Sequence, residues 1–238
     1  MALYKHIPNT ITSMNLLCGV VGVICTMEGE TGLAFLLMLL AAVFDFSDGL
    51  AARLLHAYSP IGKELDSLAD VVSFGVLPSL MLYKVQPEGA HVILRFLPLF
   101  IAVMSALRLA KFNVDERQTL DFIGLPTPAC AMVCGSLAYF LDIKGGVPAG
   151  TGPWLLDAVA IILGLLLVSE IPMFGMKIKK GHKLLDAKRI AFLVIAAAFV
   201  LAVVLMHGNW SLAVLAVFSV YIVENLVLAV INSCRRGA

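Results

Sequence analysis

Four aspartates stand close together in a stretch of the chain that is otherwise apolar. Asp45 and Asp48 are three positions apart, and a second pair, Asp66 and Asp70, is four positions apart. On α-helices, side chains three or four residues apart share one face. The residues at 58–60, Tyr-Ser-Pro, can turn the second helix back on the first. The sequence therefore predicts two helices that present four carboxylates to one point.

A cluster of four carboxylates inside an apolar stretch needs bound cations. One aspartate at mid-bilayer costs about 2.5–3.5 kcal/mol, and like charges close to one another add to that cost. Arg53 and Lys63 are too few to neutralise the cluster. Oxygen ligands without histidine or cysteine suit Mg²⁺, Mn²⁺ or Ca²⁺ rather than zinc. We therefore expect a site for two divalent metal ions.

Small and basic residues between the aspartates indicate what the metals act on. Gly49 and Ala52 clear space beside the carboxylates, and Gly62 does so on the facing helix, so that a bulky substrate can approach. Arg53 offers a planar fork for phosphate. Metals and an arginine beside a diphosphate are typical of phosphoryl transfer. For any one residue, a solvated helix cap or a helix-packing contact is the alternative.

The elements that must position these residues are membrane-spanning helices. Of 238 residues, 61% are hydrophobic and 14% are charged, against about 45–50% and about 25% in soluble domains. Apolar runs long enough to span a bilayer lie near 11–27, 31–52, 65–84, 91–112, 127–143, 154–174, 188–206 and 209–232. Since open sheet edges cannot be satisfied in lipid, the sequence predicts an all-α polytopic bundle of about eight spans. Residues 1–238 are expected to form one domain.

The basic residues predict the orientation of the bundle. If the N-terminus is cytoplasmic, only Lys84, Arg95 and Lys144 of the 17 lysines and arginines fall on the opposite side. The other 14 (17 − 3) fall on the cytoplasmic side, which is a strong positive-inside bias. These are Lys5, Arg53, Lys63, Arg108, Lys111, Arg117, Lys177, Lys179, Lys180, Lys183, Lys188, Arg189, Arg235 and Arg236. We expect both termini and the aspartate cluster on the cytoplasmic side of the inner membrane.

The aspartate array resembles the signature of a known family. Its pattern, Asp45-x-x-Asp48-Gly49-x-x-Ala52-Arg53, eight residues, then Gly62-x-x-x-Asp66-x-x-x-Asp70, is similar in full to that of the CDP-alcohol phosphotransferases. The opening at 7–12, IPNTIT, resembles the family's N-terminal segment. The stretches at 70–78, 108–113 and 124–129 resemble the phosphatidylserine synthase branch. The resemblance is dense over 7–130 and rests on hydropathy beyond that.

The resemblance implies roles for the motif residues. Asp45, Asp48 and Asp66 would be metal ligands, with Asp45 and Asp66 bridging two ions, Mg²⁺ or Mn²⁺. Asp70 would ligate the second ion and act as the general base. The residues expected to bind the CDP-lipid are Asn9, Thr12, Gly49, Ala52, Arg53, Ser59 and Gly62.

The implied reaction is transfer of a phosphatidyl group from CDP-diacylglycerol to L-serine, giving phosphatidylserine and CMP. Arg108 and Lys111, one helical turn apart at the end of the fourth span, are candidates to bind the serine carboxylate. Residues of this kind also snorkel to the membrane surface. Membrane lipids are further expected partners, a homodimer is implied by the family, and no nucleic acid partner is expected.

Three alternatives remain open from the sequence. The acceptor could be glycerol 3-phosphate or inositol phosphate, although a dianionic phosphate calls for a denser arginine cluster. The protein could instead be an ion-coupled transporter with intramembrane cation ligands, or a non-catalytic scaffold. The sequence does not decide between a diacyl and an ether-linked donor, and it assigns no partner to Glu170 or Glu224 within their apolar spans.

Overall fold

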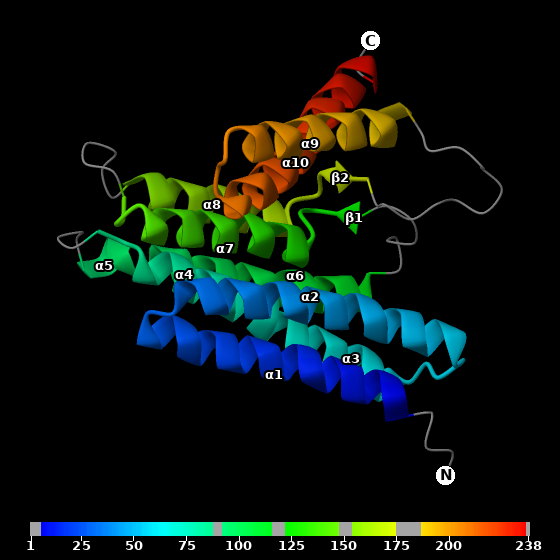
Figure 1. The fold of residues 1–238 in the computed structure, drawn as a ribbon. Helices are drawn as coiled ribbons and strands as arrows, with labels where there is room; N and C mark the ends of the chain where they lie inside the picture. The colour runs from blue at the N-terminus through cyan, green and yellow to red at the C-terminus, as the bar shows by residue number, and fades with distance from the viewer. Residues whose placement is uncertain (1–5, 88–91, 116–121, 148–153, 175–186, 237–238) are drawn as a thin grey trace.

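The computed structural model describes residues 6–87, 92–115, 122–147, 154–174 and 187–236. The elements are α1 (Ile7–Glu28), α2 (Thr31–Leu54), α3 (Pro60–Asp70), η2 (Val71–Val76), α4 (Leu77–Lys84), α5 (Val92–Arg95), η3 (Leu97–Leu99), α6 (Phe100–Val114), β1 (Phe122–Ile123), α7 (Thr127–Ile143), α8 (Trp154–Val168), β2 (Pro172–Met173), α9 (Ala187–Leu205) and α10 (Trp210–Arg236). Figure 1 shows α1, α2 and α3 on one side, α9 and α10 on the other, and α4, α6, α7 and α8 between them. The predicted all-helical architecture is confirmed.

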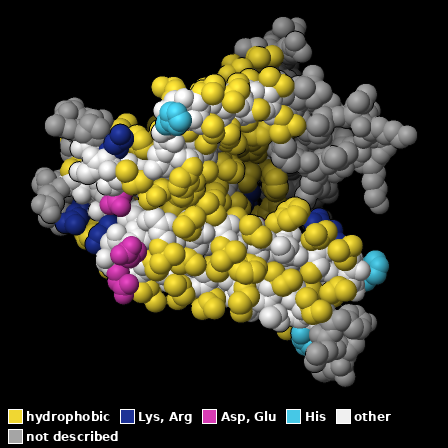
Figure 2. All heavy atoms as spheres, in the orientation of Figure 1, with side chains coloured by type: hydrophobic (Ala, Val, Ile, Leu, Met, Phe, Trp, Pro, Cys, Tyr) yellow, Lys and Arg dark blue, Asp and Glu magenta, His cyan; other side chains and the backbone are white. Residues whose placement is uncertain are grey.

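The helices match the dimensions of a bilayer. Within the described part of the chain, five helices are long and apolar enough to cross a membrane, and three shorter apolar helices accompany them. Many large apolar side chains are exposed, among them Leu17, Val43 and Phe46. Figure 2 shows apolar side chains across the middle of the molecule and most charged ones toward its two ends. The chain is therefore an integral membrane protein.

The third span begins earlier than the sequence predicts. The helix that carries it runs from Pro60 to Lys84 rather than from residue 65. Ser59 caps its N-terminus by accepting a hydrogen bond from the backbone N–H of Gly62, 2.9 Å away. Pro60 occupies the first turn, where a missing N–H costs nothing. The apolar run near 65–84 leaves out this more polar first turn, whereas the predicted turn at 58–60 and the placement of Gly62 on the facing helix agree with it.

A π-helical segment, η2, interrupts this span directly after Asp70. Pro78 has no N–H to donate to the preceding turn and its ring crowds that turn. The wider π turns relieve the conflict, and the N–H of Leu77 bonds to the carbonyl oxygen of Val72. A π-helical turn within a helix is frequently found at a functional site. This segment was not predicted from the sequence.

Glycines let α1 approach this span closely. A Cβ on Gly19 would lie 2.9 Å from the Cα of Ser73, and one on Gly22 would lie 2.7 Å from Cδ2 of Leu77. Both distances are far below ordinary contact. This close approach brings the polar residues of α1 against α3, which carries Asp66 and Asp70.

A small sheet joins two connections at one end of the bundle. β1 pairs antiparallel with β2, and Gly124, with φ of 78°, turns the chain from β1 toward α7. Asn225 and Tyr221 of α10 bind the backbone N–H and carbonyl of Phe174. These bonds fasten the chain after β2 to the last helix.

Candidate active site

Three of the four predicted carboxylates meet between α2 and α3. One carboxylate oxygen from each of Asp45, Asp48 and Asp66 lies within 4.8 Å of the others. We call these three residues the acidic triad. Helical periodicity puts the motif aspartates of each helix on one face, and the turn between α2 and α3 brings the two faces together.

The acidic triad fits a divalent cation. Two oxygens bound to one ion at 2.0–2.6 Å lie no more than about 4–5 Å apart. Oδ1 of Asp66 is buried and has no hydrogen-bond partner among the described residues, so it can act as a ligand. All the donors are hard oxygens, as Mg²⁺ and Mn²⁺ prefer.

Asp70 stands apart from the acidic triad, one turn further along, as the last residue of α3. Its side chain is only 7% exposed. The negative charges of Asp45 and Asp66 act on it. The amide Nδ2 of Asn15 donates a hydrogen bond to Oδ1 of Asp70, at 3.2 Å. The structure thus places Asp70 near enough to interact with the charges of Asp45 and Asp66, and pairs its carboxylate with the amide of Asn15.

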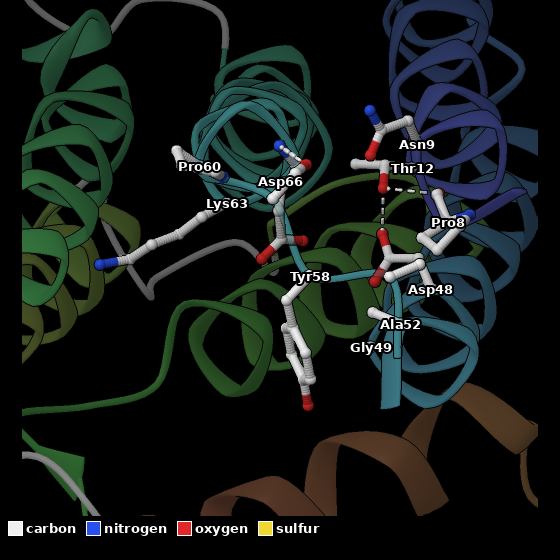
Figure 3. A pocket seen from close by; sticks show the side chains of 13 residues that line it. Pro8, Asn9, Thr12, Asp48, Gly49, Ala52, Tyr58, Pro60, Lys63 and Asp66 are labelled. Carbon is white, nitrogen blue, oxygen red and sulfur yellow. Dashed lines mark hydrogen bonds between the residues drawn. The ribbon is translucent and has the colours of Figure 1, made fainter. Parts of the chain in front are cut away.

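A cavity of about 580 Å³ opens beside the acidic triad (Figure 3). Its lining residues come from α1, α2, α3 and the turn that joins α2 to α3: Pro8, Asn9, Thr12, Asp48, Gly49, Ala52, Ala57, Tyr58, Ser59, Pro60, Gly62, Lys63 and Asp66. The hydroxyl of Thr12 donates to Oδ2 of Asp48 at 2.5 Å, which anchors α1 to the acidic triad. A Cβ on Gly49 would meet nothing within 4 Å, so this wall of the cavity is open.

Six of the seven residues predicted to bind the CDP-lipid line this cavity: Asn9, Thr12, Gly49, Ala52, Ser59 and Gly62. Arg53 is exposed at the end of α2 and does not line the cavity as the described residues form it. Sequence reasoning missed Tyr58 and Lys63 as lining residues, although Tyr58 lies between the two halves of the motif and Lys63 lies within the second half. The Nζ of Lys63 donates to the carbonyl oxygen of Asn113, 2.9 Å away, and so its charge is directed toward the end of α6.

The two predicted acceptor residues are in different surroundings. Arg108 is 7% exposed, and one of its guanidinium nitrogens donates to Oγ1 of Thr127 at 3.0 Å. Its charge and that of Asp70 attract each other. Lys111 is partly exposed and forms an ion pair with Glu170 at 3.2 Å. The structure therefore places Arg108 near the carboxylates and turns Lys111 away, and it supplies the missing partner of Glu170.

Asn15 is the site residue that sequence reasoning overlooked. It is fully buried in the middle of α1. The signal that could have found it is an amide within an apolar span, since polar side chains inside a membrane usually have a specific partner.

Known proteins are similar to this chain in sequence. The sequence model of the CDP-alcohol phosphatidyltransferase family matches residues 5–169. The chain is 37% identical over 167 residues to a CDP-diacylglycerol–serine O-phosphatidyltransferase of Bacillus subtilis, covering 70% of this chain and 89% of that protein. It is 35% identical over 213 residues to a protein of the same name from Mycobacterium leprae, with 84% and 67% covered. An archaetidylserine synthase of Methanothermobacter thermautotrophicus is 34% identical over 135 residues, with 55% and 56% covered.

Proposed function

The chain belongs to the CDP-alcohol phosphatidyltransferase family, and from this premise we propose that it transfers a phosphatidyl group from CDP-diacylglycerol to L-serine. The observation that carries the proposal is the acidic triad at the edge of a cavity lined by the motif residues. Divalent cations bound there would supply positive charge to the phosphoryl oxygens and to the departing CMP.

Different residues of the chain have different roles in this reaction. Asp45, Asp48 and Asp66 would hold the cations, with Asp70 as a further ligand as the family resemblance implies, and the open wall at Gly49 admits the nucleotide-linked diphosphate. The hydroxyl oxygen of serine attacks the β-phosphorus, a new P–O bond forms, and the bond from that phosphorus to the CMP oxygen breaks. Asp70 takes the hydroxyl proton. The products are phosphatidylserine and CMP.

Arg108 supports a small acceptor with one carboxylate. Among the described residues it is the buried basic side chain, and its planar fork suits a carboxylate. A dianionic phosphate acceptor would call for more than one such charge. The names of the relatives point to serine as well.

The positive-inside bias supports a site that faces the cytoplasm. The cavity is formed by the start of α1, the end of α2 and the start of α3, which lie at one end of the bundle (Figure 1). Arg53, Lys63 and Lys111 belong to the same side. Lys5, Arg117, Lys177, Lys179, Lys180 and Lys183 lie outside the described residues, as do the side chains of Lys188, Arg189, Arg235 and Arg236. The inner-membrane location and the homodimer stay predictions.

The test is CMP release by purified protein in detergent with CDP-diacylglycerol and each acceptor in turn. We expect release only when L-serine and Mg²⁺ or Mn²⁺ are both present. Release with glycerol 3-phosphate or inositol phosphate in place of serine would overturn the acceptor and keep the chemistry. No release with any acceptor, together with cation binding, would favour the transporter.

The two candidate acceptor residues can be separated by charge-conserving exchanges. Arg108→Lys keeps the charge but loses the fork and the contact with Thr127. A lysine in this place would lose one of the hydrogen bonds that the fork makes to the serine carboxylate. A charged hydrogen bond is worth about 1.5–3 kcal/mol, so we expect the KM for serine to rise by about tenfold or more. Lys111→Arg should change it less than about twofold, because exposed ion pairs contribute little. Equal effects of the two exchanges on steady-state KM would contradict this assignment.

A further inference from the structure

Asn15 is held at the point where α1 meets the end of α3. Its side chain is fully buried, and burial of an amide is unfavourable unless it is hydrogen-bonded. Nδ2 donates to Oδ1 of Asp70, at 3.2 Å. Oδ1 of Asn15 is buried and has no partner among the described residues. The contact with Asp70 is therefore the hydrogen bond that the structure gives this amide.

The backbone of the same residue makes a second connection to the same helix. The carbonyl oxygen of Asn15 accepts a hydrogen bond from Oγ of Ser73, at 3.0 Å. Gly19, one turn further along α1, has no side chain to collide with Ser73. One residue of α1 therefore binds the facing helix on both sides of the junction between α3 and η2.

At the junction between α3 and η2, the carboxylate of Asp70 needs a hydrogen bond from another helix to keep its orientation. Asp70 is the last residue of α3, and the π-helical turns of η2 follow at once. The amide of Asn15 is the side-chain donor that the described residues give to the Asp70 carboxylate. Asp45 and Asp66 also repel its carboxylate. The neutral amide of Asn15, which donates to Oδ1, holds the carboxylate in place against this repulsion and leaves Oδ2 to meet a substrate.

We infer that Asn15 is a positioning residue, which fixes the carboxylate of Asp70 in the orientation that accepts the proton of the acceptor hydroxyl. The inference rests on the proposed function, in which Asp70 is the base. Asn15 itself is not among the residues that line the cavity. Loss of a partner that orients a ligand or a catalytic group typically reduces activity 10–100-fold.

The test compares Asn15→Leu, which is similar in size and lacks the amide, with the matched variant Ser73→Ala. Ser73→Ala removes the other hydrogen bond of this contact and keeps the one to Asp70. For Asn15→Leu we expect kcat to fall about 10–100-fold, with the KM for CDP-diacylglycerol and for serine within about twofold of wild type. Ser73→Ala should retain kcat within about twofold.

Three results would overturn the inference: an unchanged kcat in Asn15→Leu, an equal loss of kcat in Ser73→Ala, or a loss of CDP-diacylglycerol binding that parallels the loss of turnover. Thermal unfolding of each variant in detergent accompanies the kinetics, and Asn15→Ala takes the place of Asn15→Leu if the latter does not fold. Failure of the proposed function is seen separately, because wild-type protein would then release no CMP with serine.

Discussion

Asp70→Asn is expected to reduce CMP release from CDP-diacylglycerol and L-serine by about 10²–10⁴-fold, the usual contribution of a general base. The exchange preserves the shape of the side chain but leaves an amide that cannot take the proton. Because Asp70 is not part of the acidic triad and does not line the cavity, the CDP-lipid should bind almost as before. Single-turnover kinetics and equilibrium binding of CDP-diacylglycerol measure the two effects independently.

Asp142→Asn is the matched control for this exchange. Asp142 is exposed near the end of α7, so the same change in charge should leave turnover within about twofold, as for most surface positions. Normal turnover in Asp70→Asn combined with lost CDP-lipid binding would show that Asp70 binds substrate and is not the base.

The second large effect is expected at the acidic triad. Removal of divalent cations with a chelator should abolish CMP release, and Mg²⁺ or Mn²⁺ should restore it. Asp66→Asn should lower the affinity for Mn²⁺ by about tenfold or more, because Asp66 loses the charge with which its buried, unpartnered oxygen would bind the ion. Electron paramagnetic resonance of free Mn²⁺ measures this without any substrate.

Glu64→Gln provides the comparison for Asp66→Asn. Glu64 is a carboxylate on the same helix, exposed, and in contact with the amide of Asn113. Its exchange should leave Mn²⁺ affinity unchanged. If both variants bind Mn²⁺ as the wild type does, the acidic triad is not the metal site.

Local spacing was sufficient to predict much of this protein. The positions of Asp45, Asp48 and Asp66 on facing helices follow from helical periodicity and a turn with a proline, and the eight apolar runs correspond to the five long and three shorter apolar helices. These features depend on neighbours in the sequence.

Contacts between distant segments could not be predicted. Arg108 and Lys111 are three residues apart and were both candidates to bind the serine carboxylate, but Glu170, from the connection after α8, pairs with Lys111. The π-helical segment η2 packs at Ser73 against Gly19 of α1, and the hydrogen-bond partner of Asn15 lies 55 positions away. In each case the decisive neighbour comes from another part of the chain.

The π-helical turns also limit how this protein can change in evolution. Each residue of an α-helix turns the chain by about 100°. If one residue were deleted between Asp70 and Leu77 and the turns became α-helical, the half of the span after the deletion would rotate by about that angle relative to the half before it. Asp70 could then face Asn15 only if Leu77 left its place against Gly22. Homologues with an intact site should therefore conserve the length of this segment more strictly than its residues, and insertions should accumulate in the connections between spans.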